Sequence, residues 1–412
     1  MFPLGVYDKT GLAPTDPNWN SHYDQLLDLL AANNLNVLIA QAGPNNPADP
    51  SSLLAVMDRA QARGVSVVMT VGNPGNSNWD KAGPSWPYHP AYTHPSVIAY
   101  KYGDEPKTET DLTTLLARYG NIRSFYSLPI ITALTGETMV PGSDPYATNL
   151  WQTLGTEIRW ARNYPFRRTY DLLDWYQDKL TQPMEDWCAS MEAMATTPWW
   201  YIVQTFGNGK DKDFSFYWRF PTATELSAII HLALANGARG LTAYSLQENV
   251  ALTDAQLQPN TARDGSIPLD KFAEIAALIQ AHADLLGRHI RASFAVAVDT
   301  GEVMGVPRTD PDTGRSYLYL VNKNAETSVQ GTVVIGDSSS QPANGAPPGY
   351  EELKIYRNLE SGCLLLSPVE QMTGGFTQAS EIYTGATLQA SSPGVFNYQL
   401  GPGEGQFWDF GA

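Results

Sequence analysis

Two adjacent carboxylates, Asp104 and Glu105, stand at the end of an apolar and aromatic run and are followed by Pro106. The run, from Val97 to Tyr102, is rich in β-branched and aromatic residues and predicts a buried strand. An ionised carboxylate is seldom fully buried without a partner, so two side by side need a hydrogen-bond donor, a proton or a polar cavity. Proton transfer is therefore the chemistry that this pair could do.

Apolar strand segments alternate with amphipathic helical segments over the first 290 residues. Leucines at helical spacing follow the first apolar run, and the same order of strand and helix recurs along the chain. We predict strands at residues 2–8, 36–41, 65–72, 94–106, 129–135, 141–146, 199–207 and 239–246. This pattern predicts an α/β fold, a (β/α)₈ TIM barrel. A doubly wound open sheet is the second choice, because no glycine-rich phosphate loop follows the first strand.

The composition changes after residue 290. Short alternating strands are separated there by loops rich in Gly, Pro, Ser and Asn. This pattern predicts a C-terminal all-β domain, a sandwich. We therefore expect a catalytic barrel at residues 1–290 and an accessory β-sandwich at residues 291–412.

Polar side chains follow the predicted barrel strands. In a parallel barrel the carboxyl ends of all strands meet at one mouth, so these side chains converge although they are far apart in sequence. A face that served stability alone would not collect so many carboxylates and amides. They are Asp8, Gln41, Asn73, Asp104, Glu105, Glu137, Asp144, Tyr146, Gln204, Gln247 and Glu248.

The segment His94–Pro106 resembles the fourth-strand segment of clan A glycoside hydrolases, which ends in Asn-Glu-Pro or Asp-Glu-Pro. The run Ala235 to Leu241 is similar to the passage that enters the last barrel strand in β-galactosidase-like enzymes. The resemblance covers about two thirds of the chain and is most specific at the fourth strand. It implies that Glu105 is the general acid/base, and that Asp104 donates or accepts a hydrogen bond with a sugar hydroxyl.

The seventh strand departs from that family. The family places its nucleophilic glutamate at the end of this strand, whereas this chain has Gln204. An amide cannot act as a carboxylate nucleophile. Glu248, Asp144 or Glu137, in that order, could supply the second carboxylate, or the chain could lack one.

Aromatic residues are concentrated in the predicted mouth loops, and Trp160 and Tyr164 are expected in the loop after the sixth strand. Rings of Trp and Tyr stack on the apolar face of a pyranose, so these loops favour carbohydrate subsites. We predict that substrate is bound by Asp8, Asp104, Tyr146, Gln204, Trp86, Trp218 and Tyr244. Four arginines at 159, 162, 167 and 168 form a basic cluster, for which we expect a solvated helix face; contact with an acidic sugar is the alternative.

The charge balance excludes some classes of partner. The chain carries a net charge of −16, which argues against nucleic acid and against an anionic membrane surface, because both attract clustered Lys and Arg. No apolar run is long enough to span a membrane, and no metal-ligand spacing or cofactor motif is present. We expect no cofactor and a carbohydrate partner; the sequence leaves the oligomeric state open.

The sequence thus predicts a glycoside hydrolase with Glu105 as acid/base. A catalytically inactive glycan-binding barrel is the alternative, favoured by Gln204, and a lyase or transglycosylase on the same fold stays open. The N-terminus lacks a charged segment followed by an apolar one. We therefore expect a secreted or periplasmic location where a signal peptide has been removed, and a cytoplasmic one otherwise.

Overall fold

The computed structural model describes most of the chain. The described residues are 1–8, 16–40, 50–70, 93–104, 113, 116, 119–120, 123, 127–135, 157–169, 177–194, 197–207, 216–218, 220–244, 250–251, 258–259, 262, 264–336 and 376–411. They include every strand of the barrel described below.

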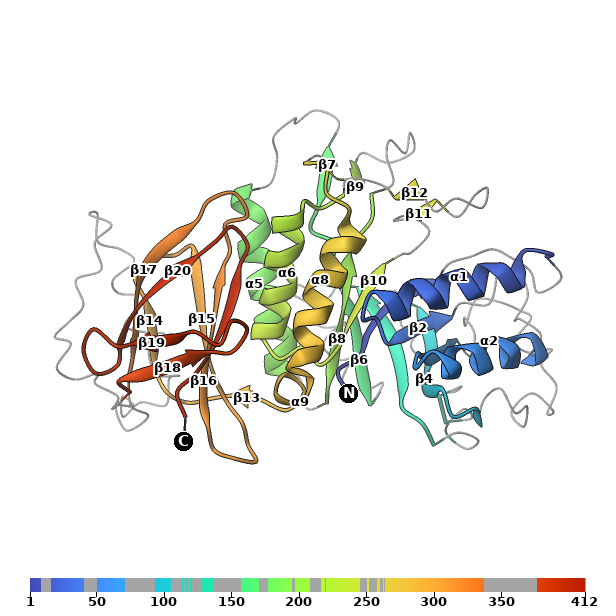
Figure 1. Ribbon diagram of the computed structural model, residues 1–412, viewed down its shortest axis with the longest axis horizontal. Coiled ribbons are helices and arrows are strands. Elements are labelled where there is room, and N and C mark those ends of the chain that lie inside the picture. The colour runs from blue at the N-terminus through green and yellow to red at the C-terminus, as the bar shows by residue number, and fades with distance from the viewer. Residues whose placement is uncertain are drawn as a thin grey trace. The chain divides into compact units, whose positions relative to one another are not determined.

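Eight parallel strands close into a barrel (Figure 1). Around the ring the order is β1-β10-β8-β6-β5-β4-β3-β2, so each strand pairs with its neighbours along the chain and β1 closes the ring against β10. The strands are β1 (Leu4–Asp8), β2 (Val37–Ala40), β3 (Ser66–Thr70), β4 (Val97–Asp104), β5 (Ile130–Thr135), β6 (Ile158–Arg162), β8 (Trp199–Gln204) and β10 (Leu241–Tyr244). The predicted barrel is confirmed, and the open sheet is excluded because the ring is closed.

The sixth barrel strand lies elsewhere than the sequence predicted. It is β6 (Ile158–Arg162), and residues 141–146, the predicted strand, lie outside the described residues. The helix face predicted for the arginine cluster is also wrong. Arg159 and Arg162 belong to β6, and Arg167 begins the short strand β7 (Arg167–Thr169), which pairs with β9 (Phe216–Trp218). Strand β6 was missed because arginines stand on both sides of Trp160 and interrupt its apolar run.

Helices follow the strands, as in other βα units. Helix α1 buries Tyr23, Leu26, Leu27 and Leu30, which recur at helical spacing on one face. The helices of this part of the chain are α1 (Trp19–Ala32), α2 (Pro50–Ala62), α5 (Gln177–Met194), α6 (Ala223–Ala235), α8 (Pro268–Ala281) and α9 (Ala283–Leu286); a small ladder pairs β11 (Val250–Ala251) with β12 (Gln258–Pro259). Among the described helices, none is both long and apolar enough to cross a membrane.

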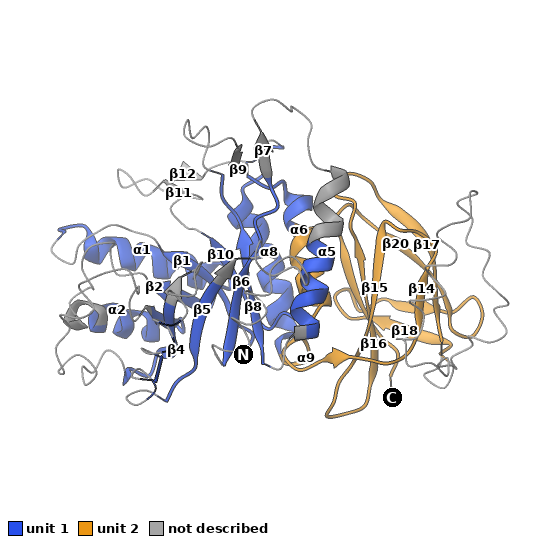
Figure 2. Ribbon diagram, turned by 180° about the vertical axis from the view of Figure 1, so that it is seen from behind, with its two compact units in different colours: residues 1–226, 238–283 blue, residues 227–237, 284–412 orange. Residues whose placement is uncertain are grey.

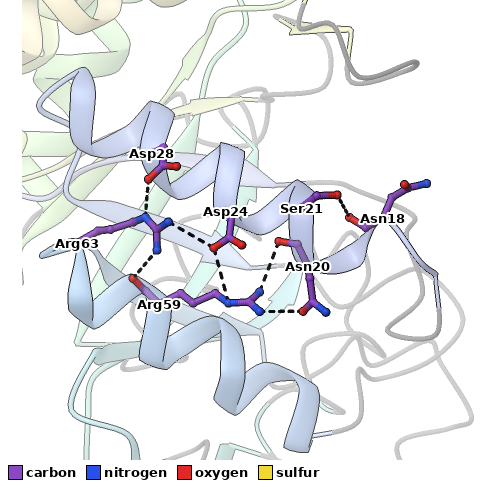
Figure 3. A network of polar contacts seen from close by, with 7 residues as sticks. All are labelled: Asn18, Asn20, Ser21, Asp24, Asp28, Arg59 and Arg63. Carbon is purple, nitrogen blue, oxygen red and sulfur yellow. Dashed lines mark hydrogen bonds and ion pairs between the residues drawn. The ribbon is translucent and has the colours of Figure 1, made fainter.

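Polar contacts join α1 and α2 (Figure 3). Arg63, just after α2, donates to Asp28 at 2.6 Å and lies 3.3 Å from Asp24, and Arg59 donates to the side chain of Asn20 at 2.9 Å. The hydrogen bond from Arg63 lowers the pKa of Asp28. Because the side chains of both aspartates are exposed and those of both arginines are partly exposed, the network orients the two helices more than it stabilises them.

The barrel interior is filled by side chains. Alternate residues of each strand point inward, and the core cluster is made of Tyr7, Val37, Ile39, Val68, Ala99, Ile131, Ala133, Trp160, Tyr164, Trp200, Ile202 and Phe206. Close approach of β1 to β2 requires Gly5, because a Cβ built there would lie 2.5 Å from the carbonyl oxygen of Val37. The barrel is therefore a packed core whose polar groups need partners.

The second compact unit comprises Ser227–Gly237 and Asp284–Ala412 (Figure 2). It contains two antiparallel sheets. The larger has the order β13-β15-β16-β21-β18-β19, and the smaller β14-β17-β20. The strands are β13 (Ile290–Arg291), β14 (Val296–Val298), β15 (Val303–Thr309), β16 (Ser316–Asn322), β17 (Val329–Ile335), β18 (Gln378–Glu381), β19 (Thr387–Gln389), β20 (Val395–Leu400) and β21 (Gly405–Asp409).

Side chains of both sheets share one apolar core. Leu318, Leu320 and Trp408 come from the larger sheet, and Val333 and Phe396 come from the smaller. The antiparallel C-terminal sheets that the sequence predicted are thus present. The domain boundary at residue 290 stays a prediction, and the first unit comprises Met1–Leu226 and Ala238–Ala283.

We expect Gly5→Ala to destabilise the first unit. The new methyl group would meet a backbone oxygen that cannot move without displacing β2, at a cost of about 1–3 kcal/mol. Urea unfolding followed by far-UV circular dichroism measures the loss. Gly120→Ala is the matched control, because a Cβ at Gly120 meets no atom within 4 Å. Equal stability of the two variants would contradict the close approach of β1 and β2.

Candidate active site

The carboxyl ends of the barrel strands bring five residues to one end of the ring. β1 ends at Asp8, β4 at Asp104, β6 at Arg162, β8 at Gln204 and β10 at Tyr244. Parallel strands in a closed barrel all end at the same mouth, where barrel enzymes have their active sites. The candidate active site therefore lies at this end of the ring.

Aromatic rings occupy the interior at this end. Tyr7 stacks on Trp160 with ring centroids 5.7 Å apart and lies 5.3 Å from Tyr244. Tyr244 in turn lies 5.6 Å from Tyr164 and 5.4 Å from Phe206. Tyr244 is half-buried, whereas the other four rings are buried. Within this aromatic cluster Tyr244 alone exposes part of its ring together with a phenol hydroxyl, the combination that suits a sugar ring.

Two cations stand among these rings. The ammonium of Lys101 in β4 donates a 3.0 Å hydrogen bond to Tyr7 Oη, and it lies 5.0 Å from the Tyr7 ring centroid and 5.7 Å from that of Trp160. The guanidinium carbon of Arg162 lies 4.8 Å from the ring centroid of Tyr164. Both geometries are those of cation–π contacts. The interior thus carries positive charge in a strongly acidic protein.

Trp160 is fixed by a polar contact as well as by its ring contacts. Its Nε1 donates to Thr242 Oγ1 at 2.7 Å, which links β6 to β10 across the interior. Arg159 precedes it in β6, and alternation turns Arg159 to the opposite side of the strand. Arg159 is buried there, and its burial lowers its pKa.

Gln204 holds a segment of backbone in place. Its Oε1 accepts a hydrogen bond from the Phe166 N–H at 2.9 Å, and its Nε2 donates to the carbonyl oxygens of Phe166 at 3.2 Å and Phe206 at 3.3 Å. The side chain is fully buried. One amide therefore satisfies both backbone groups of Phe166, as a neighbouring strand would, and ties the segment after β6 to the end of β8.

Asp8 lies on the other side of its strand from Tyr7. Its carboxylate is fully buried and lies 3.7 Å from His22 Nε2 of α1. Because Tyr7 belongs to the barrel interior, alternation directs Asp8 toward the helix layer. The substrate-binding role of Asp8 stays a prediction.

The remaining predicted residues are placed only in part. Asp104 is the last residue of β4, and Trp218 the last of β9; their backbones are described. Asp144 and Tyr146 precede β6, so their expected place at the end of the sixth strand is wrong. The catalytic candidates Glu105, Glu248, Asp144 and Glu137, with Tyr146 and Trp86, lie outside the described residues.

Among the described residues, no group of three or more His, Cys, Asp or Glu is placed to hold a metal ion.

Gln204 and Tyr244 end β8 and β10, and their substrate-binding roles stay predictions; Tyr7 and Lys101, which lie beside them, were not among the residues predicted for the site. The available signal was a single lysine inside the otherwise apolar strand segment Val97–Tyr102, since lysine is rarely buried without a reason. Trp160 and Tyr164 were expected in a mouth loop, and they belong instead to the barrel core.

Comparison with known proteins supports the fold. No protein-family model matches the sequence, and no curated protein is similar to it. The structure is similar to a glycoside hydrolase family 5 protein from Bacteroides vulgatus (TM-score 0.57, 11% identity, 99% of this chain and 89% of that chain). It is also similar to a GH42 β-galactosidase from G. stearothermophilus (TM-score 0.57, 7% identity, 100% of this chain and 98% of that chain). A third similar structure is a maltogenic α-amylase from Thermotoga neapolitana (TM-score 0.54, 10% identity, 100% of this chain and 99% of that chain). At these identities the likeness shows the fold alone.

We expect Gln204→Glu to destabilise the protein rather than to create a nucleophile. One oxygen of the introduced carboxyl would still accept from the Phe166 N–H, but the oxygen that replaces Nε2 would face two carbonyl oxygens, and that repulsion raises the pKa of the carboxyl in the folded state. The loss of stability relative to the native chain should therefore grow as pH rises from 5 to 8, reaching roughly 3 kcal/mol. Urea unfolding at both pH values measures it.

Gln61→Glu on the exposed face of α2 serves as the matched control and should change stability little. A Gln204→Glu variant that kept native stability and gained hydrolytic activity would instead mark position 204 as a nucleophile site.

Proposed function

We propose that this chain is a glycoside hydrolase that cleaves glycosidic bonds in an oligo- or polysaccharide, with Glu105 as general acid/base. The observation that carries the proposal is the position of Asp104. It ends β4 at the mouth of a closed parallel barrel whose interior holds the aromatic cluster, and Glu105 is the next residue. The structural neighbours named above are glycoside hydrolases by their descriptions, which supports the same class.

Glu105 would protonate the glycosidic oxygen as the bond breaks and later take a proton from water. The first step needs a carboxyl group that is protonated near neutral pH. An ionised Asp104 beside it supplies a like charge that disfavours ionisation of Glu105. The two groups titrate as a pair, so the proton belongs to the pair rather than to one residue.

Glu248 is our first choice for the second carboxylate. It follows β10, whose last residue Tyr244 belongs to the aromatic cluster. Asp144 and Glu137 are the other candidates, in the segment between β5 and β6. A separation of about 5.5 Å from Glu105 would give retention of configuration, and roughly 6.5–9.5 Å would give inversion.

Substrate would be held by rings and by polar groups near the mouth. Tyr244 is half-buried and fits the role of a stacking platform. Trp86, Trp218 and Tyr146 are proposed to add subsites, and Asp104 to bind a hydroxyl. Gln204 would act indirectly, because its amide groups hold the backbone of Phe166. The C-terminal sheets would form an accessory β-sandwich at residues 291–412.

A catalytically inactive glycan-binding barrel is the second candidate. The observation in its favour is that the end of β8 carries Gln204, whose amide is engaged with backbone. Elimination or transglycosylation on the same fold is a further possibility, because fold does not fix the reaction. NMR of the products separates these: an unsaturated sugar indicates elimination.

We expect Glu105→Gln to lower hydrolysis of the best substrate by about 100-fold or more, because the amide cannot donate or accept the proton. Release of reducing sugar from a panel of glycans measures it. Glu274→Gln, an exposed site on α8, is the matched control and should keep full activity.

Two outcomes would contradict the proposal. Equal activity of the native chain and Glu105→Gln would remove Glu105 from the reaction. A native chain that binds a glycan without cleaving any of the panel would favour the glycan-binding alternative.

A further inference from the structure

Lys101 is a buried cation inside the barrel. Lys101 is 3% exposed. It pairs with Ile131 of β5, and Ile131 belongs to the barrel core. Residues paired across parallel strands face the same side of the sheet, so Lys101 points inward. Its ammonium reaches Tyr7 Oη of β1 at 3.0 Å. Strands β4 and β1 are separated by β3 and β2 in the ring, so this bond spans the interior.

A lysine in this place is costly for folding. The interior of such barrels is filled mainly by branched apolar residues, and burying an ammonium loses its hydration. A hydrophobic residue of similar length often stabilises a protein when it replaces a buried charge. A chain that keeps a lysine here breaks a packing rule, and such departures are concentrated at functional sites.

The lysine also restricts what Tyr7 can do. An ammonium only donates hydrogen bonds, whereas a phenol has one proton to donate and two lone pairs to accept. Tyr7 Oη accepts from Lys101, so its own proton goes to a different acceptor. A hydrogen bond from a charged donor polarises the phenol and makes it a stronger donor. Lys101 thus makes Tyr7 a directed donor next to Trp160 and Tyr244.

The same strand connects Lys101 to the proposed reacting end. Lys101 pairs with Ile131 and Asp104 pairs with Ala133, with a bulge in β4 between them. Ile131 and Ala133 are successive core residues of β5. The backbones of Lys101 and Asp104 therefore lie two β5 positions apart in register, about 6–7 Å of strand.

We propose that Lys101 is a positioning residue for the proposed glycosidase reaction, acting through Tyr7. The Lys101–Tyr7 pair holds a polarised phenol near the carboxyl end of β1, at the same end of the barrel as the end of β4. This inference rests on the proposed function and adds to it a pair of residues from β4 and β1.

The test compares Lys101→Met, Tyr7→Phe and the double variant with the native chain on the best glycan substrate. Lys101→Met keeps the length of the side chain and removes the charge; Tyr7→Phe keeps the ring and removes the donor. We expect each single variant to lower kcat roughly 10- to 100-fold, with KM changed less than about threefold. The thermal midpoint of Lys101→Met should stay the same or rise.

The double variant is the decisive measurement. Because Lys101 acts through Tyr7, the double variant should lose no more kcat than the single variant with the greater loss. A loss equal to the product of the two single losses overturns the proposal. Lys271→Met on α8, a partly exposed lysine paired with Glu274, is the matched control and should keep full activity and stability.

Other outcomes separate this inference from the proposed function. Full kcat in Lys101→Met beside an inactive Glu105→Gln overturns the inference alone. Joint loss of thermal midpoint and activity in Lys101→Met identifies a structural role and also overturns it. If Lys101→Met does not fold, Tyr7→Phe decides: full activity overturns the inference, and lost kcat at a native midpoint supports it. A native chain with neither hydrolysis nor glycan binding overturns both.

Discussion

Closure of the barrel depends on β1, which pairs with β2 on one side and with β10 on the other. The strand can make both ladders only where its backbone approaches Val37 closely, and Gly5 permits that approach. Once β1 is in place, alternation sends Tyr7 inward and Asp8 toward α1. The position of the aromatic cluster therefore follows from backbone pairing before any side chain is considered.

Polar groups inside the barrel are satisfied by specific partners. Lys101 bonds to Tyr7, Trp160 to Thr242, and Gln204 to the backbone of Phe166. In an interior of low dielectric these hydrogen bonds are stronger than they would be in water. Each bond also joins strands that are not neighbours or a strand to a connecting segment. The polar contacts thus give a fixed arrangement to rings that apolar packing alone would leave free to rearrange.

The sequence predicted strands where a continuous apolar run could be buried, as in β5 and β8. It failed at β6, where Arg159 and Arg162 flank Trp160 and interrupt its apolar run. The sequence proposed Gln204 and Tyr244 for substrate binding, and in the structure they end β8 and β10. It missed Lys101 and Tyr7 because the inward side of a strand is set by pairing and by the bulge in β4, which spacing alone does not reveal.

The ring order bears on where a partner for Glu105 could come from. β4 and β10 are four strands apart in either direction, so they lie opposite each other. The interior of an eight-stranded barrel is only wide enough for side chains to fill, and the bond from Lys101 to Tyr7 shows that side chains of separated strands meet in its centre. The end of β8 is occupied by Gln204, which holds Phe166. A carboxylate carried past β10, such as Glu248, therefore starts from the strand that faces β4, and this geometry is the reason to prefer it over a partner at β8.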